Sequence, residues 1–206
     1  MKSPLRYQIS DYDCGPTSML NAVSFLFERE QIPPELIRNI MLFSLDAFSP
    51  DGAFGKSGTS CTAMMFLSNW LSGFGQAGRL PITTEYYTGD RVYMGQQSPI
   101  TDALHRGGAA VVRLFLDEWH YVLLTGERDG RVYLFDPYYV TECFNDSSVV
   151  TDVDHHFAYN RILPQSMLNG EAQTLYAFAE QEGREAVVLY NTETMLTPEN
   201  TIEYMI

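Results

Sequence analysis

The sequence predicts an α+β fold in which N-terminal helices pack on an antiparallel β-sheet. Helical spacing of apolar residues dominates up to about residue 71, whereas short apolar runs separated by turn residues follow from residue 109. With 206 residues, 45% of them hydrophobic and 13% aromatic, the chain is long enough for one domain with a substantial core. We therefore expect a single domain over residues 1–206.

The first expected helix begins where a polar, turn-forming stretch ends at Cys14. Apolar residues from Leu20 to Phe27 recur at the spacing of a helix with one buried face. Pro16 suits the first helical turn, where a missing N–H costs nothing, and Asp13 is a good candidate for the N-cap. Cys14 is therefore expected at a helix N-terminus, where free backbone N–H groups and the helix dipole favour a thiolate over a thiol.

The positions of Pro, Ser and Gly predict three more helices. A pair of prolines at 33–34 starts a helix that runs to about Leu45 and carries an apolar stripe expected in the core. A Gly- and Ser-rich loop over 49–60 ends in a serine that should cap a helix over 61–71. A short helix is expected over 99–106. The apolar stripe consists of Leu36, Ile37, Ile40, Met41 and Ser44.

Short apolar or alternating runs predict the strands of the sheet. The runs over 109–116, 119–125 and 131–136 are separated by short turns, so they should form an antiparallel meander behind the helix that bears Cys14. The C-terminal segment, residues 141–206, is expected to extend this sheet. Further expected elements are strands over 82–87, 157–163 and 185–191, a helical turn over 164–169, and a candidate edge strand over 201–206.

Two polar residues lie at the same end of the expected hairpin. His120 opens the strand over 119–125, Asp136 closes the strand over 131–136, and the short Gly-containing turn makes these strands antiparallel. An Asp at that place can orient the imidazole, which can then take a proton from Cys14. A single His in an apolar strand, like a single buried Cys, is more often structural, so these residues count as a site only as a set.

Gln8 is the fourth candidate residue of this set. Its side-chain amide could donate a hydrogen bond to an oxyanion that forms beside Cys14, together with the backbone N–H of Cys14. Cys61 is the alternative nucleophile, because it also lies near an expected helix N-terminus. No Gln or Asp precedes Cys61 at a useful spacing in the sequence, so Cys14 is the stronger candidate.

Several motifs occur in order along the chain: Gln8, Asp11, the Asp13–Thr17 motif DCGPT, the His120–Val122 motif HYV and the Asp136–Pro137 pair. With these motifs the chain resembles family thirty-nine of the cysteine peptidases, the bacteriocin-processing peptidases of the papain superfamily that cut peptides after a double-glycine leader. The resemblance covers roughly residues 5–140 and implies a papain-like α+β fold, with residues 141–206 as an extension. It implies Cys14 as nucleophile, His120 as general base and acid, Asp136 as the residue that orients His120, and Gln8 as oxyanion donor.

The expected activity is thiol-dependent hydrolysis of a bond in a peptide or amide substrate, with processing of a leader peptide as the specific form that the resemblance implies. The chain has no apolar run of about twenty residues, so it resembles stand-alone members of the family rather than those fused to a transporter. Acyl transfer by the same residues is one alternative. A catalytically silent relative that binds a peptide is the other.

Charge and composition exclude some classes of binding partner and indicate the compartment. The formal net charge of −13 argues against binding to nucleic acid or to an anionic membrane surface. Three cysteines at unrelated spacings predict neither a disulfide framework nor a zinc site, which suits a reducing compartment. The N-terminus lacks the apolar core of a signal peptide, so we expect a cytoplasmic protein, with secretion by another route left open.

No cofactor or metal is expected. One cluster resembles a set of metal ligands, but its adjacent histidines would point to opposite sides of an extended chain, and further His or Cys ligands do not follow at a useful spacing. The oligomeric state is left open by the sequence. The cluster consists of Asp152, Asp154, His155 and His156.

Overall fold

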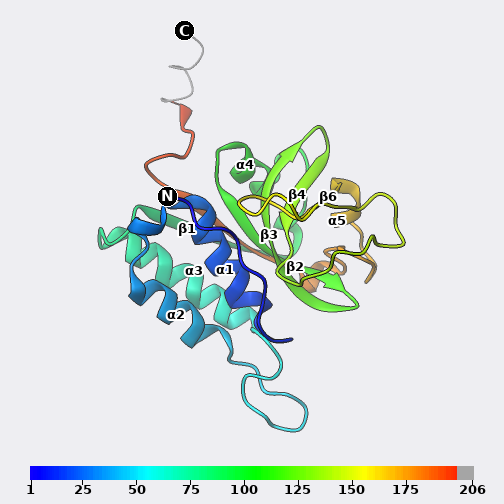
Figure 1. Cartoon of the computed structure of the whole chain (residues 1–206), viewed down its shortest axis with the longest axis horizontal. Coiled ribbons are helices and arrows are strands. Elements are labelled where there is room, and N and C mark those ends of the chain that lie inside the picture. The colour runs from blue at the N-terminus through cyan, green and yellow to red at the C-terminus, as the bar shows by residue number, and fades with distance from the viewer. Residues whose placement is uncertain (199–206) are drawn as a thin grey trace.

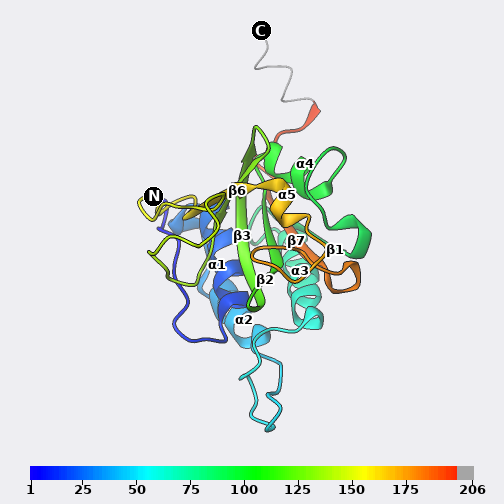
Figure 2. The same cartoon turned by 90° about the vertical axis from the view of Figure 1, so that its right-hand side faces the viewer.

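The computed structural model describes residues 1–198, in which an antiparallel sheet is covered by helices on both faces (Figure 1, Figure 2). In this part of the chain seven strands form one sheet in the order β1-β7-β2-β3-β4-β6-β5, and each neighbouring pair is antiparallel. The expected class, helices packed on an antiparallel sheet, is confirmed. The candidate edge strand over 201–206 lies outside the described residues.

The helices and strands occur along the chain in the predicted order. The helices are α1 (Cys14–Leu26), α2 (Pro34–Ser44), α3 (Cys61–Gln76), α4 (Pro99–His105) and α5 (Gln165–Leu168). The strands are β1 (Ile82–Thr88), β2 (Ala109–Leu116), β3 (Glu118–Arg128), β4 (Arg131–Phe135), β5 (Val150–Thr151), β6 (Arg161–Pro164) and β7 (Glu185–Asn191).

The central strands are buried on both faces. In β2, Ala109 and Val111 belong to the core beneath α1, α2 and α3, whereas Ala110 and Val112 belong to the core on the opposite face, beneath α4. This division follows from the alternation of side chains along a strand. It also explains why β2 reads as an almost continuous apolar run in the sequence.

The segment before α1 is folded around the carboxylate of Asp13. Asp13 occupies the N-cap position as predicted, but its side chain makes no capping bond to the first helical turn. The carboxylate instead accepts hydrogen bonds from the backbone N–H groups of Ile9 and Ser10 at 3.0 and 2.7 Å. These bonds hold the loop that leads into Cys14, so Asp13 shapes the loop rather than capping the helix.

Gly15 permits a close approach between the start of α1 and the loop before α3. A Cβ atom added at Gly15 would overlap the side chain of Thr59. The next residue of that loop, Ser60, caps α3 as predicted, because its hydroxyl accepts from the backbone N–H of Ala63 at 3.1 Å. The N-termini of α1 and α3 are therefore brought close together.

Two predictions were wrong in part, the width of the apolar stripe on α2 and the start of one strand. Ile37 and Met41, expected in the core, are 37% and 39% exposed, because α2 buries only the narrower stripe that contains Leu36 and Ile40. The strand expected over 157–163 begins only at Arg161. Residues before it form a turn, in which the backbone N–H groups of Ala158 and Tyr159 both bond to the carbonyl of His155.

Strands of the C-terminal segment join one edge of the sheet and also its middle. β6 pairs with β4, whereas β7 lies between β1 and β2. Within residues 1–198, no helix combines the length and the apolar character needed to cross a membrane.

Candidate active site

The β3–β4 hairpin brings His120 and Asp136 together, as the sequence pattern predicted. His120 lies near the start of β3, and Asp136 follows directly after the end of β4. Their side chains meet with 2.8 Å between Nε2 of His120 and Oδ1 of Asp136. The two residues are only 6% and 1% exposed, so this is a buried polar pair.

Helix α1 brings Cys14 near the imidazole of His120. The helix packs against β3, and the hydroxyl of Ser18 donates to the backbone carbonyl of Tyr121 at 3.0 Å. A hydrogen bond and the charge of Cys14 are among the causes that raise the pKa of His120, so the thiol acts on the imidazole. Asp136 uses Nε2 of the ring, which leaves Nδ1 for another partner.

Charge around His120 favours its protonated form. Burial by itself lowers the pKa of the imidazole, but the charge and hydrogen bond of Asp136, with a further contribution from Cys14, raise that pKa from 6.5 to about 10. Burial likewise acts to raise the pKa of Asp136, yet the charge of His120 and several hydrogen bonds hold it below its ordinary value. Both shifts have the sign expected of an imidazolium–carboxylate pair at neutral pH.

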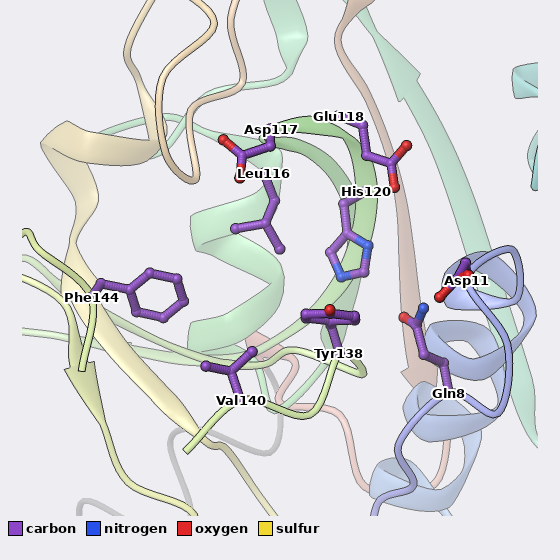
Figure 3. Close-up of a pocket in the computed structure, with 9 residues that line it drawn as sticks. All are labelled: Gln8, Asp11, Leu116, Asp117, Glu118, His120, Tyr138, Val140 and Phe144. Carbon is purple, nitrogen blue, oxygen red and sulfur yellow. The ribbon is translucent and has the colours of Figure 1, made fainter. Parts of the chain in front are cut away.

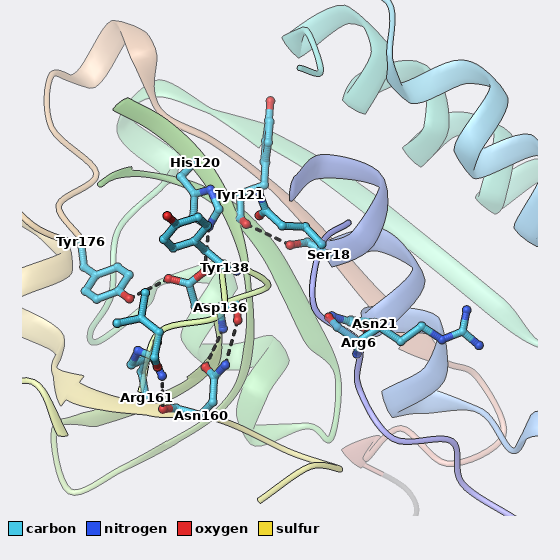
Figure 4. A network of polar contacts seen from close by, with 12 residues as sticks. Arg6, Ser18, Asn21, His120, Tyr121, Asp136, Tyr138, Asn160, Arg161 and Tyr176 are labelled. Carbon is cyan, nitrogen blue, oxygen red and sulfur yellow. Dashed lines mark hydrogen bonds and ion pairs between the residues drawn. The ribbon is translucent and has the colours of Figure 1, made fainter. Parts of the chain in front are cut away.

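Every oxygen of the Asp136 carboxylate has a donor (Figure 4). Oδ1 accepts from His120 and from the backbone N–H of Tyr138 at 2.8 Å, and Oδ2 accepts from the hydroxyl of Tyr176 at 2.6 Å. The backbone of Asp136 exchanges two 2.8 Å hydrogen bonds with the side-chain amide of Asn160. A buried carboxylate needs such partners to stay ionised.

A fully buried arginine lies next to this network. Arg161 donates to the carbonyls of Asn160 and Val140 at 2.8 and 2.9 Å, and its guanidinium lies over the ring of Phe144. Sequence reasoning missed Asn160, Arg161 and Tyr176, which lie in the segment where no motif was found. One signal was available, because an Asn-Arg pair directly before an apolar run is an unusual start for a buried strand.

Gln8 lies at the rim of the cavity that His120 lines. Its backbone N–H donates to the carbonyl of Pro137 at 2.9 Å, which ties the segment before α1 to the residue after Asp136. Its side-chain amide donates to the carbonyl of Ser10 at 2.8 Å. This bond uses one of the two N–H groups of the amide, and the oxyanion role of Gln8 stays a prediction.

Two adjacent cavities flank the Cys14–His120 pair. One, of about 550 Å³, has Gln8 and Asp11 on one side, Leu116, Val140 and Phe144 on the other, and His120 with Tyr138 between them (Figure 3). The second, of about 600 Å³, is lined by Cys14, by the loop residues 56–59 and by the side chains of Arg113, Trp119 and Tyr121. Asp11 and Glu118 line both cavities, so together they form a cleft that passes the candidate nucleophile.

Cys61 has different surroundings. Its sulfur lies 3.4 Å from Nη1 of Arg113, and the buried carboxylate of Glu185 is close by. Burial, followed by the hydrogen bond and charge of Glu185, raises the pKa of the Cys61 thiol, which disfavours a thiolate. Cys61 is not among the residues that line either cavity of the cleft. These surroundings favour Cys14 as the nucleophile.

The candidate metal cluster is not assembled. Within residues 1–198, no group of three or more His, Cys, Asp or Glu side chains could hold a metal ion. Asp152 and His155 form a single contact of 3.1 Å between Oδ2 and Nε2. The chain matches no protein-family model and no curated protein.

Proposed function

We propose that the protein is a cysteine peptidase of papain-like fold, in which Cys14, His120, Asp136 and Gln8 hydrolyse a peptide bond. The observation that carries this proposal is the position of His120, which is buried, bonded to the Asp136 carboxylate, influenced by the Cys14 thiol and exposed to one cavity of the cleft. A structural histidine in a β-strand needs neither a thiol partner nor an open cleft beside it. The fully partnered carboxylate gives the imidazole a fixed orientation.

The chemistry follows from these positions. In the resting pair the proton of Cys14 is already on His120, which is held as an imidazolium, and the Cys14 thiolate attacks the substrate carbonyl to form a tetrahedral intermediate. The Gln8 amide and the backbone N–H of Cys14 stabilise its oxyanion. His120 then gives its proton to the leaving amine, and a thioester remains on Cys14. Water, deprotonated by His120, attacks this acyl group and releases the free acid with the thiol.

The cleft suits an extended peptide. It provides one cavity on the His120 side and one on the Cys14 side, so residues on both sides of the cut bond would have a place. The resemblance to double-glycine leader peptidases makes a leader peptide the first substrate to test. All three cysteines are free, and catalysis would require Cys14 to stay reduced in the compartment where the protein works.

The test is alkylation by a small haloacetamide across a range of pH, with each cysteine read out by mass spectrometry. Cys14 should react fast well below the pH at which ordinary thiols react, and His120→Gln should abolish that advantage. Cys61 and Cys143 serve as internal controls in the same sample. An ordinary thiol profile for Cys14, matching that of Cys143, would contradict the proposal and favour a peptide-binding protein.

A peptide-library screen then identifies the substrate, with Cys14→Ser as the inactive control and Cys61→Ser as the matched active one. Added amines separate two reactions of the acyl intermediate. Products that carry the amine would indicate acyl transfer, and free acids alone would indicate hydrolysis.

A further inference from the structure

The C-terminal part of the chain contributes a residue to the candidate site. Tyr176 lies between α5 and β7, forty positions beyond Asp136, and it is fully buried. Its hydroxyl donates to Oδ2 of Asp136 at 2.6 Å, whereas His120 and the backbone N–H of Tyr138 occupy Oδ1. Tyr176 thus holds the oxygen of Asp136 that His120 leaves free (Figure 4).

The backbone at Tyr176 is unusual. Its φ angle is +56°, in the left-handed region that side chains other than glycine rarely adopt. The conformation is fixed by the end of β2, because the N–H of Tyr176 donates to the carbonyl of Phe115 at 2.7 Å and the N–H of Phe115 donates to Ala177 at 2.9 Å. An unfavourable conformation persists only where its surroundings impose it, and such residues cluster at functional sites.

The charges around this contact keep the tyrosine neutral. Burial, then the charge of Asp136, raises the pKa of Tyr176 well above its ordinary value, although the nearby Arg161 acts in the opposite direction. The hydroxyl therefore remains a donor at all working pH values. The groups that face His120 are Asp136 and Cys14, and the ring of Tyr138 lies edge-on to it. Asp11 and Glu118 line the cleft beside it.

We propose that Tyr176 is a positioning residue, which keeps Asp136 ionised and turned toward His120 and so sets the pH below which the Cys14–His120 pair fails. The claim that Tyr176 sets the pH limit of the Cys14–His120 pair rests on the proposed peptidase function. The claim that Tyr176 keeps Asp136 ionised is independent of that function. The proposal gives residues 141–198 a role that the resemblance, which ends near residue 140, did not provide.

The experiment compares Tyr176→Phe with the wild type and with Tyr86→Phe. Tyr86 is a matched control, because its hydroxyl also donates to a buried carboxylate, that of Glu185, at 2.8 Å. The titration of Asp136 is followed by NMR of protein labelled with ¹³C at the aspartate carboxyl groups. Loss of a hydrogen bond to a charged group should move the Asp136 titration up by about one pH unit in Tyr176→Phe and leave it unmoved in Tyr86→Phe.

The acid limb of Cys14 alkylation should move up with the Asp136 titration. If Asp136 stays ionised in Tyr176→Phe down to the pH where the wild type unfolds, the proposal is wrong. If Cys14 behaves as an ordinary thiol but the Asp136 titration moves, the peptidase function fails and the role of Tyr176 stands.

A second substitution covers the case in which Tyr176→Phe does not fold. Site-specific Tyr176→3-fluorotyrosine keeps the ring and makes the hydroxyl a stronger donor, so the Asp136 titration and the acid limb of alkylation should both move to lower pH. No movement of either, or movement in the opposite direction, would overturn the proposal.

Discussion

Nε2 of His120 lies 2.8 Å from Oδ1 of Asp136, although the two residues are sixteen positions apart, one in β3 and the other directly after β4. The β3–β4 hairpin accounts for this contact by pairing Leu123 with Phe135 just inside the two residues. Because the hairpin fixes the register of the strands, it also fixes which acid meets the imidazole. The site is therefore built into the sheet, and α1 brings the thiol to it.

Replacing His120 by Gln should lower kcat/KM on a cleaved peptide by about 10²–10⁴-fold, the range expected for loss of a general acid–base group. His105→Gln is the matched control, since His105 lies exposed at the end of α4 and contacts Glu127. Steady-state kinetics on both variants provide the measurement. Equal activity of His120→Gln and the wild type would remove His120 from the mechanism.

Stability should fall as the pH rises through about 10. The pKa of His120 is raised from 6.5 to about 10 in the folded state, because the attraction of Asp136 and the contact with Cys14 outweigh the effect of burial. The folded protein therefore holds this proton more tightly than the unfolded chain. The resulting stabilisation is fully present below pH 6.5 and is lost between pH 6.5 and 10.

Urea unfolding at pH 6, 8 and 10 would show this loss as a free energy of unfolding that declines with pH. The His120→Gln variant should be less stable at pH 6, by up to about 3–5 kcal/mol, because Asp136 would be left buried without its cationic partner. It should also lack the decline that His120 causes. A wild-type decline that persists unchanged in His120→Gln must come from other groups.

Gln8→Ala should reduce kcat by about 10²–10³-fold, the cost of losing an oxyanion donor. Alkylation of Cys14 by a haloacetamide passes through no oxyanion, so its rate should change little in this variant. The two assays together separate an oxyanion role from a general disturbance of the site. A parallel fall in both rates would show that Gln8 only supports the loop before α1.

Gly15→Ala should destabilise the fold by about 1–3 kcal/mol, because the new methyl group would overlap the side chain of Thr59. Gly73→Ala in α3 is the control: an added Cβ there meets nothing within 4 Å, so the change should be neutral or stabilising. Thermal unfolding measures both. Thr59→Gly should recover part of the loss in a double variant, and an additive second loss would contradict the overlap.

Local patterns predicted the parts of the site that lie close together in the chain. Two apolar runs and a short turn predicted the hairpin that joins His120 to Asp136. The start of a helical pattern predicted that Cys14 lies at a helix N-terminus. Tyr176 could not be read in the same way, since its contact with Asp136 depends on a left-handed residue in an irregular segment. No periodic pattern marks such a segment.

The order of the strands in the sheet could not be predicted from the sequence either. The run over 185–191 predicted β7 with its bounds, but apolar character does not say which neighbours a strand will have. Ile37 and Met41 show a similar limit, because helical spacing marks an apolar stripe without showing how wide the covering partner is.

The place of β7 has a consequence for how the protein is made. β1 is joined to the rest of the sheet through β7, which pairs with β1 on one side and β2 on the other. β7 must therefore leave the ribosome before these strands can pair, although β1 is made about a hundred residues earlier, and contacts of such long sequence separation form slowly. Tyr176 emerges almost as late. A growing chain thus carries Cys14 long before the contacts around Asp136 can be completed, so the enhanced reactivity proposed for Cys14 should appear only after Tyr176 and β7 have left the ribosome.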